Sequence, residues 1–408
     1  MDNAPSRIAV VGFGPAGLSC AQTLRAEGYA GALHVFSAET ALPYERPALS
    51  KAFLTGASAT DIGLLPDDGL SGQSLTLRLG ETVERVEHGS LVTRSGSEET
   101  FDRILLATGL IPRELPGDLL DGTPTLHALR DLADAGALRE QLLPGREIVL
   151  IGGGYIGLEV AATAVALGCS VTVVEMGARL LARSAPPMLA DWLMAKHAAN
   201  GVRFRLGMGV ERVMDVGQRT LVKLTTGETL TADCVLVGIG GVPCLPDLPD
   251  GVMRSATGGL VVDEAMKTGV PGLFAAGDIA EAWNATQGCR IRPEAWQSAE
   301  LQGAAAARGM LGLPTEPFGT NWFWTDQYDA NIQMLGDLRS HDRVILRGDP
   351  AEERFTAFLL TGDVVTGAVF VNSGRDVRPT RKAIDARLTV DAAALTDADA
   401  PLRQVLAA

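Results

Sequence analysis

The segment EIVLIGGGYIGLEV (residues 147–160) decides how this chain folds. An apolar run typical of a buried strand leads into a G-x-G-x-x-G pattern, and a helical pattern follows. The earlier segment RIAVVGFGPAG (residues 7–17) has the same design. In such a unit the first glycine permits a tight turn, the second lets the backbone approach a pyrophosphate, and the third lets the helix pack against the strand. The glycines concerned are Gly12, Gly14 and Gly17, and Gly152, Gly154 and Gly157. The sequence therefore predicts two dinucleotide sites in one polypeptide.

The acid expected after each unit differs between the two. Glu175 ends the second strand of the later unit, where a carboxylate pairs with the ribose 2′-hydroxyl of NAD and repels the 2′-phosphate of NADP. Arg179 and Arg183 follow and are the residue type that an NADP site uses, although we expect surface cations or pyrophosphate contacts. NAD is thus favoured and NADP stays open. In the earlier unit the nearest acid is Glu39, slightly late for the ribose, so a backbone group is the alternative.

Composition narrows the class of protein. A chain of 408 residues exceeds what one hydrophobic core usually supports, so two or three domains are expected. With 35 basic and 49 acidic residues, the net charge of −14 argues against nucleic acid or an anionic membrane as partner. The first residues lack the apolar core of a signal peptide, and no apolar stretch reaches the ~18–20 residues of a membrane span. We expect a soluble, cytoplasmic protein.

The five cysteines give no sign of a redox disulfide or a metal site, because they are scattered without a C-x-x-C pair. Cys20, Cys169 and Cys234 lie among apolar residues and are expected to be small buried hydrophobes. Cys244 and Cys289 lie in loop-like sequence, where reactivity stays open.

Two nucleotide sites suggest two nucleotides that exchange electrons, and the usual pair is FAD with NAD(P)H. Later segments fit this interpretation. RILLATGL (103–110) is a predicted strand that ends in Ala107-Thr108-Gly109, and CVLVGIGGVP (234–243) is its counterpart in the second unit. In GLFAAGDIAE (272–281), Asp278 follows a strand and starts a turn, where it can accept hydrogen bonds from ribityl hydroxyls.

Six further segments have a distinctive composition. They are LPYERPALSKAFL (42–54), TLHALRDLADA (125–135), GGGYIGLEVAA (152–162), LFAAGDIA (273–280), RPEAWQSAELQG (292–303) and NWFWTDQYDANIQMLG (321–336). Through them, nearly the whole chain resembles the FAD-dependent NADH:ferredoxin reductases of bacterial oxygenase systems, the putidaredoxin reductase group of the glutathione-reductase-type superfamily. Ala38 and Ala48 depart from the family pattern, which often has an acid and a proline there, and leave the details of adenosine binding open.

The resemblance implies an α/β fold with two Rossmann-like dinucleotide-binding domains and a C-terminal α+β domain. The expected boundaries are 1–110 and 240–318 for a discontinuous FAD domain, 111–239 for an NADH domain and 319–408 for the C-terminal domain.

The resemblance also implies site residues. Those expected to bind FAD are Gly12, Gly14, Ala16, Gly17, Glu39, Arg46, Lys51, Val83, Ala107, Thr108, Gly109, Arg130, Asp278, Glu294 and Trp296. Those expected to bind NAD are Gly152, Gly154, Tyr155, Ile156, Gly157, Glu159, Glu175, Arg183 and Gly238. Lys51 is expected near the flavin ring, where its cation stabilises the electron-rich reduced flavin, and is expected to pair with Glu159. Surface ions flanking a turn are the alternative for this pair, and a core position is the alternative for Trp296.

The implied activity is hydride transfer from NADH to FAD, a positioning problem that needs no catalytic base. The chain has no cysteine where disulfide reductases or peroxidase-type relatives place theirs, so single electrons are expected to pass to an iron–sulfur ferredoxin. That ferredoxin would feed a Rieske dioxygenase or a haem-thiolate monooxygenase. The residues expected to dock it are Trp324, Arg375, Arg378, Arg381 and Lys382, for which a core tryptophan and a solvated helix face are the alternatives.

Three other functions are weighed. An NADH oxidase or peroxidase-like flavoprotein would pass electrons to oxygen. A protein resembling apoptosis-inducing factor would bind DNA, against which the acidic charge argues. A degenerate structural homologue would have broken glycine patterns, whereas both patterns are intact.

Overall fold

The chain forms two compact units in the computed structural model, which describes residues 5–65 and 75–406. Unit 1 comprises Met1–Tyr44, Gly63–Ile111 and Val242–Phe323, and unit 2 comprises Glu45–Ile62, Pro112–Gly241 and Trp324–Ala408. Two short strands, β8 (Leu110–Pro112) and β18 (Gly241–Pro243), lie where the chain passes from one unit to the other. The three-domain boundaries expected from the sequence stay a prediction.

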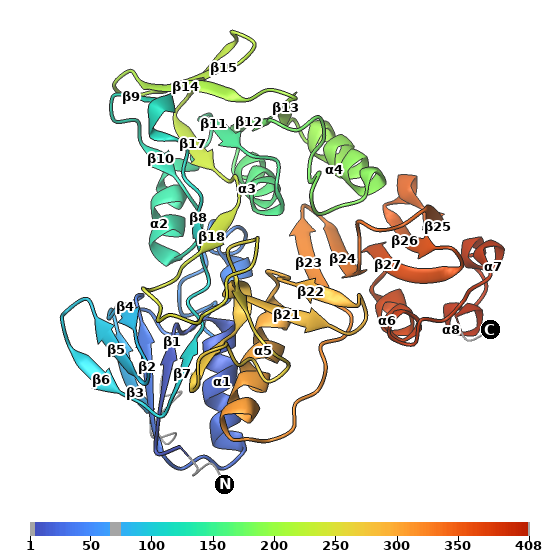
Figure 1. Ribbon diagram of the computed structural model, residues 1–408. Helices are drawn as coiled ribbons and strands as arrows, with labels where there is room; N and C mark the ends of the chain where they lie inside the picture. The colour runs from blue at the N-terminus through green and yellow to red at the C-terminus, as the bar shows by residue number, and fades with distance from the viewer. Residues whose placement is uncertain (1–4, 66–74, 407–408) are drawn as a thin grey trace. The chain divides into compact units, whose positions relative to one another are not determined.

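Unit 1 is built on a parallel sheet whose strand order is β20-β7-β1-β2-β3 (Figure 1). Its strands are β1 (Arg7–Val11), β2 (Ala32–Ser37), β3 (Leu75–Leu79), β7 (Arg103–Leu106) and β20 (Leu273–Ala275). β1 lies at the centre, where Ile8 pairs with Leu33 on one side and Arg103 on the other. Because both faces of a parallel sheet are covered, β1 has no alternation and its last four residues are all buried.

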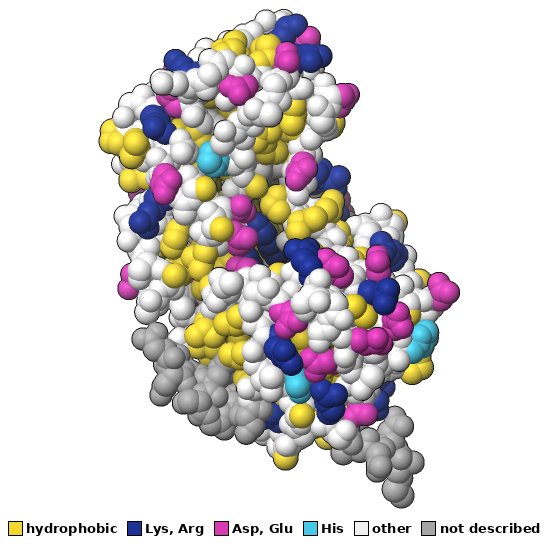
Figure 2. Space-filling model, turned by 90° about the vertical axis from the view of Figure 1, so that its left-hand side faces the viewer, with side chains coloured by type: hydrophobic (Ala, Val, Ile, Leu, Met, Phe, Trp, Pro, Cys, Tyr) yellow, Lys and Arg dark blue, Asp and Glu magenta, His cyan; other side chains and the backbone are white. Residues whose placement is uncertain are grey.

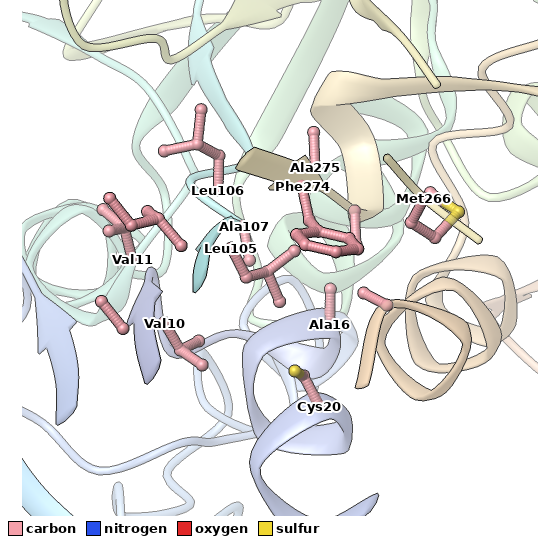
Figure 3. Packing of buried hydrophobic residues seen from close by; sticks show 14 of the residues in the cluster. Val10, Val11, Ala16, Cys20, Leu105, Leu106, Ala107, Met266, Phe274 and Ala275 are labelled. Atoms are coloured by element: carbon pink, nitrogen blue, oxygen red, sulfur yellow. The ribbon is translucent and has the colours of Figure 1, made fainter. Parts of the chain in front are cut away.

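Helices α1 (Pro15–Ala26) and α5 (Trp296–Met310) pack against each other in unit 1, and Ser19 Oγ of α1 donates to the carbonyl of Glu300 at 2.7 Å. Figure 3 shows Ala16 and Cys20 of α1 packed near side chains of β1, β7 and β20. The remaining elements of the unit are β4 (Val83–Val86), β5 (Ser90–Thr93), β6 (Glu98–Thr100), β19 (Leu260–Val261), η3 (Gly277–Ile279), β21 (Ala280–Asn284) and β22 (Cys289–Ile291). The strands form two small sheets, β4-β5-β6 and β19-β21-β22.

Unit 2 repeats the parallel design with the order β10-β17-β11-β12-β13. Its strands are β10 (Leu126–His127), β11 (Glu147–Ile151), β12 (Ser170–Glu175), β13 (Arg203–Leu206) and β17 (Cys234–Val237), and its helices are α2 (Leu132–Gln141), α3 (Tyr155–Ala166) and α4 (Pro187–Ala199). A second sheet has the order β16-β15-β14-β9 and consists of β9 (Leu120–Asp121), β14 (Val210–Asp215), β15 (Thr220–Leu224) and β16 (Thr229–Ala232). Two short 3-10 helices, η1 (Arg46–Ala48) and η2 (Gly117–Leu119), also belong to this unit.

The C-terminal part of unit 2 is an antiparallel sheet with helices. The strand order is β23-β24-β27-β26-β25, and the strands are β23 (Trp322–Gln327), β24 (Ala330–Gly336), β25 (Arg343–Asp349), β26 (Arg354–Thr361) and β27 (Val364–Val371). The helical elements are η4 (Pro350–Glu352), η5 (Gly374–Asp376), α6 (Val377–Asp385), α7 (Ala392–Thr396) and α8 (Leu402–Val405). Two parallel sheets with strand–glycine–helix turns and a C-terminal α+β part confirm the predicted fold class.

The surface mixes charges of both signs. On the face drawn in Figure 2, acidic and basic side chains alternate over short distances, so the excess of acids is spread out on the described part of that face. Within residues 5–65 and 75–406, no helix combines the length and the apolar character needed to cross a bilayer.

Candidate functional site

The first glycine turn joins β1 to α1. Gly12 has φ +103°, and a Cβ there would lie 2.2 Å from the carbonyl oxygen of Ala107, so only glycine fits. A Cβ on Gly17 would lie 2.0 Å from the carbonyl oxygen of Gly12, which confirms the close helix–strand packing expected of this residue. Gly14, the N-cap of α1, has no atom within 4 Å of its Cβ position among the described residues. The backbone is therefore open to a ligand at the position where the sequence predicts a pyrophosphate.

The second turn joins β11 to α3 with matching geometry. Gly152 has φ +109°, and its Cβ would lie 2.3 Å from the carbonyl oxygen of Gly238. Gly238 thus stands in unit 2 where Ala107 stands in unit 1. A Cβ on Gly157 would lie 2.8 Å from the carbonyl oxygen of Gly152. A Cβ on Gly154 would meet, among the described residues, only the carbonyl oxygen of Gly238, at 3.9 Å. Both turns have the shape that a dinucleotide requires.

The helices after these turns begin without a capping side chain. Neither Gly14 nor Gly154, the two N-caps, has a side chain to cap the helix, so the first N–H groups of α1 and α3 are not capped in that way. These N–H groups and the positive end of the helix dipole favour an anion. The residues present therefore fit the diphosphate of a dinucleotide in each unit.

Three further residues predicted to bind FAD, Ala107, Thr108 and Gly109, follow β7. The backbone N–H of Ala107 donates to Val11 O at 2.7 Å, and the Thr108 hydroxyl donates to the carbonyl of Cys244. The N–H of Cys244 in turn donates to Gly109 O at 2.9 Å. The strand end at Ala107 is therefore held directly beside Gly12.

Two acids of unit 1, Glu39 and Asp278, are predicted to bind FAD. Glu39 lies two residues beyond β2, and its Oε2 accepts from the Tyr44 hydroxyl at 2.5 Å. Asp278 lies in η3 next to Gly277, whose N–H donates to the buried Gln302 Oε1 at 2.8 Å. Tyr44 therefore holds the Glu39 carboxylate, and Gln302 holds the backbone of the turn that carries Asp278. The roles of both acids in binding a ribose or a ribityl chain stay predictions.

Val83, Trp296 and Glu294, the other residues of unit 1 predicted to bind FAD, differ in their exposure. Val83 is buried in the hydrophobic core at the start of β4, and Trp296 is half-buried as the first residue of α5. Glu294 is exposed and has φ +51°, a strained conformation for a residue with a Cβ. Arg292 holds it with an ion pair of 2.7 Å. Such local strain is typical of functional positions, so Glu294 stays a candidate.

Lys51 and Glu159 form an ion pair in unit 2, with 2.7 Å between Nζ and Oε2, as the sequence predicts. The lysine also donates to Pro47 O at 2.9 Å, and the Ser50 hydroxyl donates to the same Glu159 oxygen at 2.5 Å. Glu159 is 8% exposed, so its charge needs these partners. The alternative of surface ions is excluded by this burial.

Helices α2 and α3 hold the segment that presents Lys51. Thr163 of α3 donates to Ser50 O at 2.8 Å, and the guanidinium of Arg139 in α2 lies 5.4 Å from the Phe53 ring centroid. Arg46, also predicted to bind FAD, donates to the carbonyl of Arg130 at 2.6 Å. The structure thus brings Arg46 and Arg130 together, and Lys51 and Glu159 together.

Polar residues that the sequence did not single out complete the surroundings of Glu159. Its second oxygen accepts from the Thr325 hydroxyl at 2.6 Å, and Thr325 accepts from Gln327 at 3.0 Å. Gln327 is bonded to His197 at 2.7 Å. Thr325 and Gln327 are the buried positions of β23, although strand alternation next to three aromatic residues predicts apolar side chains facing inward. The sequence signal that could have identified Thr325 and Gln327 is their polar character at two alternating positions of a strand next to aromatic residues.

Glu175 ends β12 beside the second turn. Its two oxygens accept from the N–H groups of Gly153 at 2.7 Å and Gly177 at 2.6 Å. Arg179 donates to the carbonyl of Ala185 at 3.0 Å and so belongs to the loop, whereas Arg183 is exposed. The carboxylate is therefore anchored by the backbone, with lone pairs left for a ribose.

Tyr155 and Ile156 begin α3. The Tyr155 hydroxyl lies 3.1 Å from Met334 Sδ and 3.4 Å from Ser184 O, two acceptors within reach of its single hydrogen. Burial raises the pKa of Tyr155, so the ring stays neutral. Ile156 is 50% exposed, an unusual exposure for an isoleucine beside a glycine turn, and leaves an apolar surface at the helix start.

Comparison with known proteins agrees with this architecture. The pyridine nucleotide-disulphide oxidoreductase family matches residues 6–303, and the reductase C-terminal family matches residues 322–406. The chain belongs to the pyridine nucleotide-disulphide oxidoreductase family. The resemblance drawn from the sequence motifs is thereby confirmed, and membership makes the chain a flavin-dependent oxidoreductase that uses a pyridine nucleotide.

Solved structures of this family are similar over their full length. The putidaredoxin reductase in a covalent putidaredoxin reductase–putidaredoxin complex is 33% identical, with a TM-score of 0.92 and 99% of each chain covered. A ferredoxin reductase for the CYP199A2 system from Rhodopseudomonas palustris is 30% identical, with a TM-score of 0.91 and coverage of 98% of this chain and 99% of that one. A water-forming NADH oxidase from Lactobacillus brevis has a TM-score of 0.85 and covers 98% and 97% of the two chains, but at 18% identity it shares only the fold.

The cysteines of this family member differ in environment. Cys20, Cys169 and Cys234 are buried, as predicted, and burial raises the pKa of Cys234 to about 12. Cys244 is half-buried, and Cys289 is exposed on β22. All five are free thiols.

The residues expected to dock a partner lie in unit 2. Arg375, Arg378 and Lys382 are exposed on η5 and α6, whereas Arg381 is half-buried and burial lowers its pKa. The exposed members form a basic patch, defined here as Arg375, Arg378 and Lys382. Trp324 is half-buried in β23.

Proposed function

We propose that this oxidoreductase is an NADH-dependent ferredoxin reductase that binds FAD at the first glycine turn and NADH at the second. The main support is the ion pair between Lys51 and Glu159, in a chain of 408 residues without a C-x-x-C pair. Glu159 lies in α3, two residues beyond the last glycine of the NADH turn. A bound flavin takes two electrons at once and passes them on singly. With no paired thiols to accept both electrons, an external iron–sulfur protein is the acceptor that fits.

The side chains supply positioning and electrostatics. Lys51 places a cation, held by Pro47 O and Glu159, where it stabilises negative charge on a reduced cofactor. Glu175 selects NADH, because its anchored carboxylate can accept from a ribose 2′-hydroxyl and repels a 2′-phosphate. We propose that the ferredoxin docks at Trp324 and the basic patch and that it serves a Rieske dioxygenase or a haem-thiolate monooxygenase.

The decisive experiment separates the acceptors. Purified protein should be yellow, should be reduced by NADH in preference to NADPH, and should reduce cytochrome c only when a [2Fe–2S] or [3Fe–4S] ferredoxin is added. Rapid NADH oxidation by oxygen without a ferredoxin would instead indicate an oxidase. A protein that stays colourless and does not take up FAD would contradict the proposal altogether.

Glu175→Gln tests the cofactor preference. Losing a hydrogen bond to a charged group costs ~1.5–3 kcal/mol, so KM for NADH should rise roughly 10- to 100-fold while that for NADPH changes less. Steady-state kinetics with both nucleotides measures this. Arg212→Gln, at an exposed cation of β14, is the matched control and should leave the NADH/NADPH ratio within about twofold of wild type. An unchanged ratio in Glu175→Gln would remove the carboxylate from the recognition of the ribose.

A further inference from the structure

A continuous row of buried polar side chains in unit 2 ends at Glu159. His197 of α4 and Gln327 of β23 are joined by 2.7 Å between Nε2 and Oε1, and Gln327 Nε2 lies 3.0 Å from Thr325 Oγ1. Thr325 then contacts Glu159 Oε1 at 2.6 Å. His197, Gln327 and Thr325 are each at most 1% exposed. Buried polar groups of this kind stabilise a fold only when every one is satisfied.

The carboxylate fixes the direction of every hydrogen bond in the row. Glu159 as a carboxylate can only accept, so the Thr325 hydroxyl must donate to it. The Thr325 oxygen then accepts from the amide NH₂ of Gln327, which turns the amide oxygen toward His197. His197 must therefore donate from Nε2.

The other end of the row agrees with this assignment. His197 Nδ1 is then without a hydrogen and accepts from the Tyr328 hydroxyl at 2.9 Å. Burial lowers the pKa of His197, which keeps the ring neutral, and burial raises the pKa of Tyr328 to about 12, which keeps the phenol protonated as a donor. Each link has one hydrogen, and only one tautomer of His197 satisfies them all.

The row determines which oxygen of Glu159 faces Lys51. With Oε1 occupied by Thr325, Oε2 is left for Lys51 at 2.7 Å and Ser50 at 2.5 Å. A donor on Oε1 also draws negative charge away from Oε2 and so leaves more of the Lys51 charge uncompensated.

We propose that His197, acting through Gln327 and Thr325, is a positioning residue that sets the orientation and charge distribution of the Lys51–Glu159 pair. Its effect on a flavin rests on the proposed function, whereas the hydrogen-bond row itself does not.

The first experiment examines the row in the wild-type protein. Nitrogen NMR of histidine-labelled protein should show His197 as the neutral tautomer protonated at Nε2. A ring protonated at Nδ1, or at both nitrogens at neutral pH, would reverse the link to Gln327 and overturn the proposal.

The second experiment tests the coupling to Glu159 without reference to a cofactor. The shifts of the melting temperature in His197→Leu, Glu159→Gln and the double variant should be non-additive. His197→Leu removes the donor from which the row of hydrogen bonds to the Glu159 carboxylate begins, and the neutral side chain of Glu159→Gln no longer depends on that row. Additive shifts of the melting temperature would contradict the coupling. His197→Leu paired with Phe204→Leu gives a reference for packing alone, since Phe204 touches the His197 ring edge-on without joining the row.

The third experiment measures the reduction potential of the bound flavin. Thr325→Val and His197→Leu should lower it, because Glu159 then neutralises Lys51 more completely. His197→Gln, whose amide can replace the Nε2 donor, and Phe204→Leu should keep the wild-type value. A potential in Thr325→Val at or above that of wild type would overturn the positioning role.

Lys51→Met separates the two proposals. If its flavin potential equals that of wild type while the tautomer and the coupling are as expected, Lys51 does not act on the flavin and the proposed function is at fault. If Lys51→Met shifts the potential but His197 variants show no coupling to Glu159, the positioning row is at fault.

Discussion

Gly12 is the residue on which the first turn depends. Its positive φ and the nearby carbonyl of Ala107 leave no room for a side chain, whereas Gly14 has a negative φ and open space around its Cβ position. The two glycines of one motif therefore serve different ends: the first is required by the chain itself, and the second is available to a ligand.

Alanine substitution should separate these two roles. Gly12→Ala should lower the free energy of unfolding by more than ~3 kcal/mol, because a Cβ would overlap the backbone at a strained φ. Gly14→Ala should change it by less than ~1 kcal/mol yet weaken flavin binding by reducing access to the backbone. Chemical denaturation and flavin titration measure the two effects. Equal losses of stability in both variants would show that Gly14 too is a structural residue.

The buried His197 should make stability depend on pH. Burial lowers its pKa, so the unfolded chain binds a proton more readily than the folded one. An unfolded histidine titrates at about pH 6.5, so the stabilisation is complete above that pH and is lost progressively as the pH falls below it. Denaturation of wild type and His197→Gln between neutral and mildly acidic pH should show a steeper loss in wild type.

His127→Gln is the control for this pH dependence, because burial also lowers the pKa of His127, and Asp134 partly opposes that shift. His127→Gln should flatten the dependence of stability on pH less than His197→Gln does. Parallel profiles for wild type and His197→Gln would mean that His197 titrates alike in both states.

At the scale of elements, the C-terminal helices depend on a single arginine of an edge strand. α7 and α8 are too short to be stable alone. Arg347 of β25 is 8% exposed, and its guanidinium donates to the carbonyls of Leu395, Asp397, Ala398 and Ala400. One side chain thus satisfies the backbone between the two helices.

Arg347→Met should release this segment. The loss of several hydrogen bonds from one charged donor is expected to cost ~3 kcal/mol. Hydrogen exchange should accelerate at residues 392–406. Arg343→Met, at an exposed arginine of the same strand paired with Asp363 at 2.9 Å, is the control and should cost no more than ~1 kcal/mol. Unchanged exchange in Arg347→Met would show that packing alone holds the segment.

At the scale of the whole molecule, charge opposes the proposed partner. The net charge of −14 repels an acidic ferredoxin at a distance, so productive encounters require a local cluster of the opposite sign. The basic patch on η5 and α6 offers such a cluster.

Reversing this patch should slow the encounter. The double variant Arg378→Glu and Lys382→Glu is expected to lower the second-order rate of ferredoxin reduction about tenfold at low ionic strength, with a smaller effect at high salt. Stopped-flow kinetics at several salt concentrations measures it, and reduction of ferricyanide should be unaffected. Arg212→Glu, at an exposed cation of β14, is the matched control. A rate unchanged by the double variant would make α6 a solvated helix face.

Much of the fold was accessible from the sequence because its determinants are local. The glycine turns, the strands before them and the helices after them follow from the steric freedom of glycine and from short apolar runs. The missing cysteine pair is likewise a property of the sequence itself. The family motifs added the Lys51–Glu159 pair, whose geometry the structure confirms.

What surrounds that pair was decided by tertiary structure alone. Ser50 and Glu159 are separated by 109 residues and Thr325 and Glu159 by 166, so their contacts arise from how helices and strands pack and not from any local pattern. Whether Thr325 or an aromatic neighbour faces inward depends on the placement of β23, which strand alternation alone does not fix. Local sterics therefore determined the turns. The polar row that ends at Glu159 exists only because long-range packing brings three distant segments together around α3: residues 50–51, His197 of α4, and residues 325–327 of β23.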